Sequence, residues 1–528
     1  MEAATVAELK REYVVRDPAT GEEAGRYPLM GRDDVDRAVK RAREVFESWR
    51  RSSFQERRRI FLRAAEIIAE NAEHYADRIA KENGKTRLDA MLADLYPAAD
   101  LLKYYAKKGE AFLSPVRVSG SILLPGRRAY YVFEPKGVVG AIAPWNYPFS
   151  LSAGPVISAV MAGNTVVLKP SSQTTDAGLI VKEILEKAGL PRDVVQVVTG
   201  NGSVTGQALI EHEGLDMLFF TGSTAVGRQV NIKAAERLIP AVMELGGKDV
   251  AIVTKHADLD RAVNGVIFGA FTNCGQTCIG TELVLVDRAV YQPFVDKLTA
   301  LAKKLKTGKQ AGRIGSMTMA EQLKIVEDQV ADAVEKGAKV VTGGQREPGP
   351  GMFFPPTLFL DTTPDMKVRK DESFGPLKPI VPYDTIDEAI AIANGTEYGL
   401  SGAVFTKDLD EGRRIAHRLK TGSVNINDVL ITYAMPQLPF GGAKHSGVGR
   451  YHGKMGLRAF TDIKSITEFN WPLKREPYWY PLPENADKVA ADALKTLFGR
   501  GLFKRAAALW SLVKGVVAGA RLLRNERP

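Results

Sequence analysis

The sequence has few of the residues that build disulfide frameworks and metal centres. Among 528 residues there are only two cysteines, Cys274 and Cys278, and six histidines scattered singly along the chain. A disulfide scaffold requires more cysteines, and a metal site requires His or Cys partners at ligand spacing. We therefore expect no disulfide and no metal, and the low cysteine content suits a reducing compartment such as the cytoplasm.

A signal peptide and a membrane-spanning segment are also missing from the pattern. Residues 1–16 are charged and lack the apolar core of a signal peptide, so we expect no secretion signal. The apolar stretch at residues 506–520 is interrupted by Lys514 and is shorter than the ~20 residues that a membrane span requires.

The composition is that of an ordinary globular protein, with 45% hydrophobic and 25% charged residues. A single core stops growing near ~250–300 residues, so a chain of this length predicts at least two lobes. The net charge of +10 suggests nucleic-acid binding at first sight. However, residues 485–528 contain nine Lys or Arg and three acidic residues, a net +6 that leaves only +4 for the rest. We therefore expect no nucleic-acid partner.

The body of the chain shows the alternation of strands and helices that is typical of parallel sheets. Helical periodicity runs through residues 33–106, including 54–80. Short apolar runs at 138–143, 165–168, 194–198 and 217–220 alternate with helical stretches at 151–161, 176–188 and 203–211. A second set of strands is expected near 284–286, 340–341, 380–381 and 403–405. The pattern predicts an α/β protein with two Rossmann-like lobes, each with a mostly parallel sheet.

Two segments fall outside this alternation. Residues 116–134 carry β-branched and aromatic residues around Pro125-Gly126, which predicts a hairpin or arm. Residues 490–524 predict a single basic amphipathic helix, with one apolar side at Phe498, Leu502, Leu509, Val513, Val516 and Ala520. Such a helix either contacts an anionic membrane, packs on another subunit or caps a substrate entrance.

Three residues at predicted turns or strand ends are candidates for chemistry. Cys278 lies among small polar neighbours and would be a strong nucleophile once ionised, although cysteines are more often buried apolar residues. Glu244 ends an apolar run before a double glycine and could act as a base, or be a surface residue at a turn. Asn146 follows another strand and could donate to an oxyanion, or simply form a turn.

Two further segments have features of a dinucleotide site. Residues 220–227, Phe-Thr-Gly-Ser-Thr-Ala-Val-Gly, follow an apolar strand and open a helix, where backbone N–H groups can hold a pyrophosphate. The spacing differs from the usual glycine fingerprint, so a plain tight turn is an equal alternative. Lys169 ends a strand where a ligand crevice is expected in parallel sheets.

Taken together and in order, these motifs resemble those of the aldehyde dehydrogenase superfamily. The resemblance runs from about residue 17 to about residue 470. It includes Pro144-Trp145-Asn146, Lys169-Pro170-Ser171, the 220–223 turn, Glu244-Leu-Gly-Gly-Lys248, Gly275-Gln-Thr-Cys278, Glu372-Ser-Phe-Gly-Pro376, Asn427, Pro439-Phe-Gly-Gly442 and Lys444-His-Ser-Gly447. The segment Lys169–Thr174 and the run Gly449-Arg-Tyr-His-Gly453 are most similar to succinate-semialdehyde-type and related broad aldehyde dehydrogenases.

The resemblance implies oxidation of an aldehyde to a carboxylic acid. Cys278 would attack the aldehyde, and the Asn146 amide with the Cys278 backbone N–H would hold the oxyanion. Hydride transfer to the nicotinamide would leave a thioester, which Glu244 would hydrolyse by activating water. Cys274 would be structural. The aldehyde would be a semialdehyde or an aliphatic or long-chain aldehyde; a coenzyme A-acylating enzyme and a catalytically silent scaffold are the alternatives.

The resemblance also implies a cofactor site and an oligomer. NADP or NAD would be held by Trp145, Lys169, Ser172, Gly222, Ser223, Thr224, Gly227, Leu245, Glu372 and Phe374. Many NAD-preferring relatives carry Glu where this chain has Ser172, so we expect NADP or dual use. The expected domains are NAD(P)-binding (1–115 and 135–244), catalytic (245–444), an oligomerisation arm (116–134 and 445–470) that makes a homodimer or homotetramer, and the extension (471–528).

Overall fold

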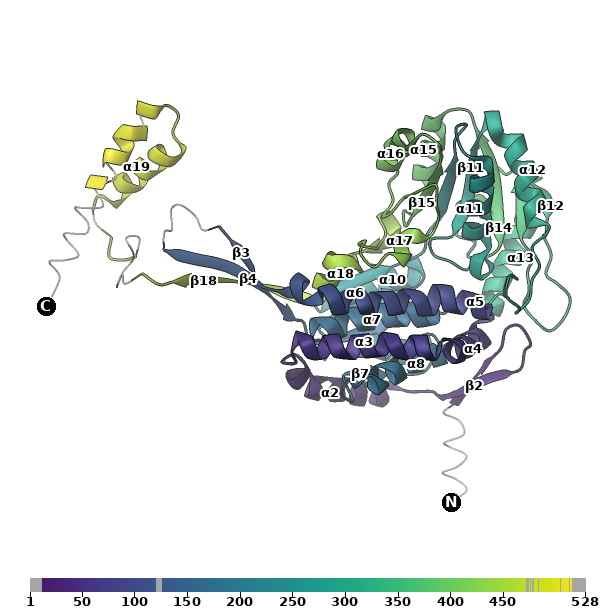
Figure 1. The fold of residues 1–528 in the computed structure, drawn as a ribbon, viewed down its shortest axis with the longest axis horizontal. Helices are drawn as coiled ribbons and strands as arrows, with labels where there is room; N and C mark the ends of the chain where they lie inside the picture. The colour runs from purple at the N-terminus through teal and green to yellow at the C-terminus, as the bar shows by residue number, and fades with distance from the viewer. Residues whose placement is uncertain are drawn as a thin grey trace, which may run out of the picture. The chain divides into compact units, whose positions relative to one another are not determined.

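A computed structural model describes residues 12–119, 126–471, 474, 476, 479–482, 484–503, 505–511 and 513–514. The chain forms two compact units (Figure 1). The first contains residues 1–115 and 132–464, and the second contains residues 116–131 and 465–528.

The first lobe of the large unit is built on a six-stranded sheet in the order β17-β9-β8-β5-β6-β7. Its strands are β5 (Val138–Ile142), β6 (Thr165–Lys169), β7 (Val195–Val197), β8 (Met217–Thr221), β9 (Ala241–Glu244) and β17 (Gly447–Val448). All neighbours pair in parallel except β9 and β17, which are antiparallel.

Helices cover both faces of this sheet because successive strand residues point to opposite faces. Val138 and Leu218 face a cluster with α2 (Arg32–Trp49), α9 (Gln207–Ile210) and α10 (Thr224–Glu236). Val139 and Phe219 face a larger cluster on the other side. That side is covered by α3 (Phe54–Glu70), α4 (Ala72–Asn83), α6 (Tyr96–Leu113), α7 (Pro148–Ala162) and α8 (Thr175–Lys187).

The second lobe contains a seven-stranded sheet in the order β12-β13-β14-β11-β10-β15-β16. Its strands are β10 (Asp249–Val253), β11 (Thr281–Asp287), β12 (Lys339–Thr342), β13 (Thr357–Leu360), β14 (Leu377–Tyr383), β15 (Gly402–Phe405) and β16 (Asn425–Ile426). Helices α11 (Leu259–Phe271), α12 (Tyr291–Ala302) and α13 (Ala320–Glu335) pack on one face, and α15 (Ile386–Gly395) and α16 (Leu409–Arg418) pack on the other (Figure 1).

Short elements complete the large unit. An antiparallel pair, β1 (Glu12–Arg16) and β2 (Glu23–Pro28), lies near the N-terminus. The remaining elements are α5 (Arg87–Asp89), η1 (Ala90–Leu95), η2 (Gly202–Gly206), η3 (Thr272–Gly275), η4 (Arg288–Val290), α14 (Lys367–Lys370), α17 (Ile431–Ala434), η5 (Lys444–Ser446) and α18 (Gly453–Ala459).

The strand order of the first sheet creates a crevice between β5 and β8. From β5 the chain adds β6 and β7 on one side of the sheet, and then returns to add β8 and β9 on the other. Ligands of open α/β sheets bind at this reversal, beyond the carboxyl ends of the strands. Residues 144–146 follow β5, residues 222–223 follow β8, and Glu244 ends β9, so the sequence motifs converge on this edge.

The structure confirms the predicted α/β class with two parallel-rich sheets and corrects two helices. Residues 54–80 form two helices, because the chain turns at Asn71, whose side-chain amide donates to the Ile67 carbonyl at 2.9 Å. The expected helix at 203–211 begins as the π-helical turn η2 and becomes α-helical only at Gln207.

In the predicted arm, β3 (Val116–Val118) pairs antiparallel with β4 (Arg127–Pro135), with Val116 opposite Tyr131. The strand β18 (Thr461–Phe469) lies on the other side of β4. The predicted turn at Pro125-Gly126 falls partly outside the described residues. Of the range expected to belong to the arm, 445–470, the β17 residues pair with β9 in the first lobe, and β18 joins the arm sheet.

The prediction of one helix over residues 490–524 is wrong. Helix α19 (Ala486–Phe498) ends just before Gly499, and Gly501 has a φ of +93°, a conformation that a glycine adopts without strain. A second helical segment begins at residue 502, and residues 515–528, including Val516 and Ala520, lie outside the described part. In the described residues, no helix has the length and apolar character that crossing a membrane requires.

Candidate active site

One cavity of about 430 Å³ lies between the two lobes of the large unit. Nine of the residues that the sequence identified line it, namely Trp145, Asn146, Gly222, Ser223, Glu244, Leu245, Cys278, Glu372 and Phe374. The other lining residues are Pro144, Leu151, Thr221, Gly246, Gln322, Ile325, Asp371, Tyr398, Leu400, Phe440 and Tyr451. Lys169, Ser172, Thr224 and Gly227 are not among the lining residues.

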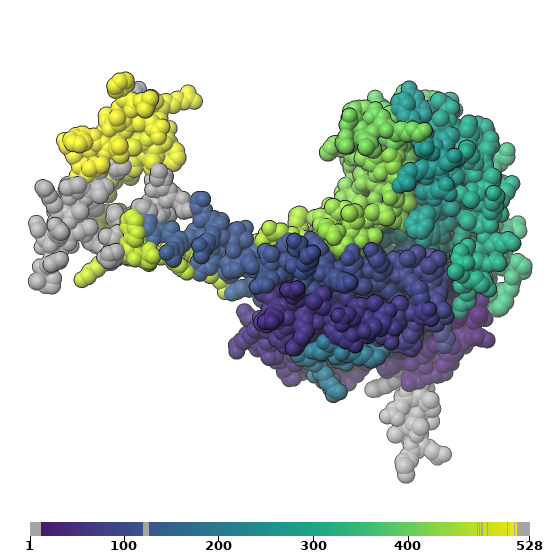
Figure 2. All heavy atoms as spheres, viewed as in Figure 1, coloured from purple at the N-terminus to yellow at the C-terminus, as the bar shows by residue number. Residues whose placement is uncertain are grey.

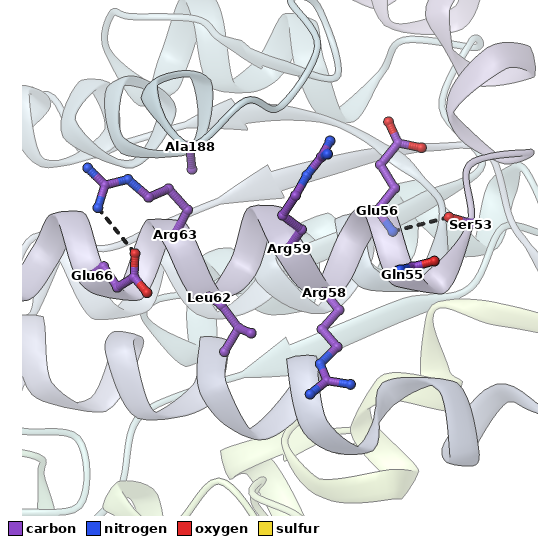
Figure 3. Close-up of a pocket in the computed structure, with 9 residues that line it drawn as sticks. All are labelled: Ser53, Gln55, Glu56, Arg58, Arg59, Leu62, Arg63, Glu66 and Ala188. Carbon is purple, nitrogen blue, oxygen red and sulfur yellow. Dashed lines mark hydrogen bonds and ion pairs between the residues drawn. The ribbon is translucent and has the colours of Figure 1, made fainter.

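A larger hollow, of about 1030 Å³, lies on the outer surface of α3 and contains none of these groups. Figure 3 shows that its arginines do not converge, since Arg58 and Arg59 point to opposite sides of the helix. Arg63 donates to Glu66 at 3.2 Å, and the Ser53 hydroxyl caps the Glu56 N–H at 3.1 Å. The hollow therefore has the features of an ordinary polar helix surface.

Cys278 lies in the loop between α11 and β11. Asn273 and Cys274 adopt positive φ angles of 51° and 57°, and this left-handed turn directs the chain back towards the sheet. The Cys278 side chain is half-buried and lines the cavity. Burial raises the pKa of its thiol, and the nearby carboxylates of Asp249, Glu372 and Glu244 raise it further. A hydrogen bond from the Ile279 backbone N–H lowers this pKa by a smaller amount.

The second cysteine has a different environment. Cys274 is fully buried in the core of the second lobe, and its sulfur lies 3.7 Å from the Phe354 carbonyl oxygen. Burial raises the pKa of this thiol to about 12. Cys274 does not line the cavity, so its position fits a packing residue.

Glu244 ends β9, and its carboxyl group is buried with no hydrogen-bond partner for either oxygen among the described residues. Burial raises the pKa of this carboxyl well above its ordinary value, and the Arg450 guanidinium lowers it only partly. The main chain is firmly held, because the Glu244 carbonyl accepts from Gly222 N–H at 3.1 Å. An unpartnered buried carboxylate that faces a cavity is an available proton acceptor.

Asn146 is buried at the start of the segment that leads into α7. Its Nδ2 donates to the Gln276 carbonyl at 3.0 Å, in the loop that carries Cys278. The backbone carbonyl oxygen of Asn146 accepts hydrogen bonds from Lys85 Nζ at 2.9 Å and from Asn273 Nδ2 at 2.8 Å. Because one amide N–H is bonded to Gln276, the second remains for a ligand in the cavity.

The turn after β8 has the features of a phosphate-binding helix N-terminus. The Ser223 side chain caps α10 by accepting from Val226 N–H at 3.5 Å. A side chain at Gly227 would place its Cβ 2.2 Å from Leu245 Cδ2, so Leu245 would have to move to make room for it. The buried Thr221 hydroxyl beside this turn has no partner among the described residues. These features fit the pyrophosphate of a dinucleotide.

Lys169 and Ser172 lie beside this crevice, at the end of β6. The Lys169 side chain is buried, and its Nζ donates to the Pro170 carbonyl at 3.0 Å. Burial lowers the pKa of Lys169 to about 8. Ser172 is half-exposed in the turn before α8.

The opposite wall of the cavity comes from residues 372–374 of the second lobe. Glu372 accepts from Gly247 N–H at 3.0 Å, and burial raises the pKa of its carboxyl to about 8. Phe374 packs edge-on against Trp145, with ring centroids 5.3 Å apart. Glu282 holds this segment from behind, since it accepts from the backbone N–H groups of Ser373 and Phe374 at 2.9 and 3.1 Å.

One residue at the site that was not found from the sequence is Tyr433. Its aromatic side chain packs edge-on against Phe440 and Tyr451, two motif residues that line the cavity. Tyr433 lies in α17, where the sequence offered no motif. In the part of the chain that the structure describes, no group of three or more His, Cys, Asp or Glu is placed to hold a metal ion.

Comparison with known proteins identifies the family. The sequence profile described as "Aldehyde dehydrogenase family" matches residues 5–466. A protein of Mycobacterium ulcerans named putative succinate-semialdehyde dehydrogenase [NADP(+)] 2 is 39% identical over 455 residues, covering 85% of this chain and 86% of the relative. The 4,4'-diapolycopene aldehyde oxidase of a Methylomonas species is 37% identical over 466 residues, covering 88% and 87%.

A solved structure gives the same result. The NAD+ complex of an aldehyde dehydrogenase from Bacillus cereus superposes with a TM-score of 0.83 and is 34% identical, covering 87% of this chain and 93% of that one. The match extends over both lobes, because no shorter segment could cover this much of either chain. This chain therefore belongs to the aldehyde dehydrogenase family of NAD(P)-dependent enzymes.

Proposed function

We propose that this enzyme oxidises an uncharged, apolar aldehyde to the carboxylic acid through a thioester on Cys278. The observation that supports the proposal most strongly is that Cys278, Glu244 and Asn146 line one cavity together with the turn after β8. A soft nucleophile, a base and an oxyanion donor in one cavity are the groups that such a reaction needs.

Cys278 attacks the aldehyde carbon in this proposal, and its thiol must first lose a proton. The thiol pKa is raised by burial, so it does not ionise by itself at neutral pH. Glu244 is the proposed acceptor, because its own raised pKa makes it a stronger base than an exposed carboxylate. Attack forms a C–S bond and places negative charge on the former aldehyde oxygen, which accepts a hydrogen bond from Asn146 Nδ2.

Release of the acid requires water. We assign its activation to Glu244, which has no partner that would have to be displaced first. Glu244 first releases to solvent the proton that it took from the thiol. It then takes one proton from water while the hydroxyl attacks the thioester carbonyl, and the thiolate of Cys278 leaves. The Asn146 amide again stabilises the oxyanion. This carboxylate favours hydrolysis over transfer of the acyl group to coenzyme A.

A nicotinamide dinucleotide, when bound, supplies the hydride acceptor for the oxidation. The proposed holding residues are Ser223 and the α10 N-terminus for the pyrophosphate, Lys169 and Ser172 for the adenosine ribose, and Glu372 for the nicotinamide ribose. Trp145, Leu245 and Phe374 would enclose the nicotinamide. Because Ser172 leaves room and no negative charge for a 2′-phosphate, we propose that NADP is used at least as well as NAD.

The cavity lining favours an uncharged substrate over a semialdehyde that carries a carboxylate. The apolar side chains of Leu151, Leu400, Phe440 and Tyr451 line it, as do the acidic Asp371 and Glu372. No Lys or Arg is among the described lining residues. A substrate carboxylate would therefore be desolvated without a cation to pair with, which is costly.

The arm sheet supports a proposal about assembly. Most side chains of β18 are exposed, and an exposed edge strand is a template for pairing with another chain. We propose a homodimer or homotetramer formed through this sheet, to be tested by the mass of the purified protein in light scattering.

We place the enzyme in the cytoplasm, since both cysteines are free thiols and the nucleophile must stay reduced.

The test is the formation of NAD(P)H by purified enzyme with hexanal, dodecanal, benzaldehyde and succinic semialdehyde, each with NAD and with NADP. We expect turnover with the uncharged aldehydes and loss of turnover in Cys278→Ser. Cys274→Ser, which replaces the cysteine outside the cavity, is the matched control and should stay active. No turnover with any pair, or an active Cys278→Ser enzyme, would refute the proposal in favour of a non-catalytic relative. A clear preference for succinic semialdehyde would overturn the substrate class alone.

A further inference from the structure

The C-terminal unit contains a small helical hairpin, defined here as residues 486–514 and drawn in yellow (Figure 2). Helix α19 forms its first arm, and the segment that begins at residue 502 forms its second. Three hydrogen bonds join the arms: Arg505 donates to the Thr496 carbonyl at 2.7 Å and to the Leu497 carbonyl at 3.4 Å, and the Ser511 hydroxyl bonds to Asp492. Ala508 is buried between them. The hairpin is therefore a packed structure with a defined outer surface.

The outer surface of the hairpin is rich in large apolar side chains. Leu502 and Phe503, which begin the second arm, are 86% and 94% exposed. Trp510 is 66% exposed, and the exposed set also includes Leu494, Phe498, Leu509 and Val513. Soluble surfaces rarely leave so many large apolar side chains together without a partner. Among the described residues of this unit, no segment covers these apolar side chains.

The charge on the hairpin indicates the partner. The hairpin carries exposed cationic groups at Lys495, Arg500 and Arg505, and the segment 485–528 has a net charge of +6. Its two carboxylates are the exposed Asp487 and the half-buried Asp492, which is already bonded to Ser511 and lies 3.9 Å from Lys495. The surface offered to a partner is therefore apolar and cationic.

A second copy of this hairpin is a poor match for such a surface. Residues 486–514 contain six Lys or Arg and two Asp, a net charge of +4, so two copies would bring like charges into contact, and like charges at an interface oppose association. A lipid surface with anionic headgroups complements both features, because the aromatic and aliphatic side chains enter the headgroup boundary while Lys and Arg pair with phosphates. Tryptophan and phenylalanine are frequent in helices that lie in this boundary.

We propose that the hairpin docks the protein on the surface of a membrane that contains anionic lipids, with Leu502 and Phe503 inserted below the headgroups. The docking does not depend on the catalytic proposal. The functional consequence of docking does rest on the catalytic proposal. A docked enzyme would take up lipophilic aldehydes at the membrane, where these molecules partition, and not from the aqueous phase.

The experiment uses the full-length protein and sedimentation with vesicles of phosphatidylcholine alone or mixed with phosphatidylglycerol. We expect binding to the mixed vesicles, much weaker binding to phosphatidylcholine, and weakening by added salt. The double variant Leu502→Glu/Phe503→Glu should lose at least tenfold in apparent affinity. Leu238→Glu is the matched control, since Leu238 is also 94% exposed but lies outside the hairpin, and it should bind normally.

Three results would overturn the proposal. They are no binding to the anionic vesicles, equal binding by the double variant, or a lower mass of the double variant in light scattering, which would place the apolar surface between copies of the chain. Oxidation of hexanal, a short aldehyde, is measured on the same preparations. Because the substituted residues lie outside the cavity, this activity should not change, so a failure of docking and a failure of the catalytic proposal give different results.

Discussion

Lys85 Nζ lies 2.6 Å from Asp94 Oδ2, and both side chains are completely buried. The pair connects the main chain at Asn146, the proposed oxyanion donor, with the first turn of α7. Lys85 also donates to the Asn146 carbonyl at 2.9 Å, while the other Asp94 oxygen accepts from the Phe149 and Ser150 N–H groups that open α7. The main chain on both sides of Asn146 is thus held by one ion pair.

Asp94→Asn should therefore reduce both stability and catalysis. A buried lysine that loses its partner costs about 3–5 kcal/mol of the free energy of unfolding, measured in urea. A displaced Asn146 should lower kcat about ten- to hundredfold while leaving the KM for cofactor nearly unchanged. Asp384→Asn is the control, because Asp384 pairs with Arg288 on the exposed surface and its loss should leave both unchanged. An Asp94→Asn enzyme with a normal kcat would show that the pair is only structural.

Glu244→Gln should separate acylation from hydrolysis. Because Glu244 is proposed both to accept the thiol proton and to activate water, the variant should release about one equivalent of NAD(P)H per site in a slowed burst and then turn over at least about a hundredfold more slowly. Stopped-flow absorbance measures both phases. Absence of the burst would assign the residue to thiol activation instead, and an unchanged steady-state rate would remove it from the mechanism.

The same variant should change the dependence of stability on pH. The folded pKa of Glu244 is raised, so between the unfolded pKa of about 4.3 and the folded pKa the native state holds a proton that the unfolded state has lost. Stability from this group is therefore present at low pH and falls as the pH rises through that window. Urea titrations of Glu244→Gln should show a smaller fall than the parent between acidic and neutral pH. A parallel pair of curves would contradict the raised pKa.

Ser172→Glu should shift the cofactor preference towards NAD. The new carboxylate would repel a 2′-phosphate and accept a hydrogen bond from a 2′-hydroxyl. The ratio of kcat/KM for NADP to that for NAD should fall about tenfold or more, about 1.4 kcal/mol. Gln173→Glu adds the same charge at the next, also half-exposed residue and should change the ratio less. Equal effects of the two variants would mean that Ser172 is not at the phosphate.

The use of NADP should weaken as the pH rises past the pKa of Lys169. Burial lowers this pKa to about 8, so the ammonium is charged below that pH and neutral above it. The KM for NADP should increase as the pH rises through this range, whereas the KM for NAD, which lacks the 2′-phosphate, should change less. Steady-state titrations of both cofactors at fixed aldehyde test the difference. Parallel pH profiles would place Lys169 away from the phosphate.

The parts of the fold that follow local rules could be predicted from the sequence. The runs at 138–143 and 217–220 are buried on both faces of a parallel sheet, so their apolar character is continuous and easy to recognise. The break in residues 490–524 was missed because the amphipathic period continues through Gly499 and Gly501. Only the hairpin contacts of Arg505 and Ser511 distinguish two packed helices from one long helix.

The residues of the site also fall into two groups, those that a local sequence pattern predicts and those that it does not. Motif residues such as Cys278 and Glu244 could be named because each lies in a short segment with a recognisable composition. Lys85 and Asp94 could not be named, since they are nine residues apart in a helical region where a charged pair normally faces solvent. Their burial arises from the packing of η1 against α7, which no local pattern in the sequence contains. Tyr433 was missed for the same reason.

The way in which Glu244 is held has a consequence for how its carboxyl group can move. Its backbone is fixed on both edges of β9, by β17 on one side and by β8 with the following Gly222 N–H on the other, so any movement of the carboxyl group must come from rotation of the side chain. Glu244 is buried, so this rotation needs free space in the cavity that the side chain lines. Whatever fills the cavity therefore also decides whether the carboxyl group can exchange a thiol partner for a water molecule.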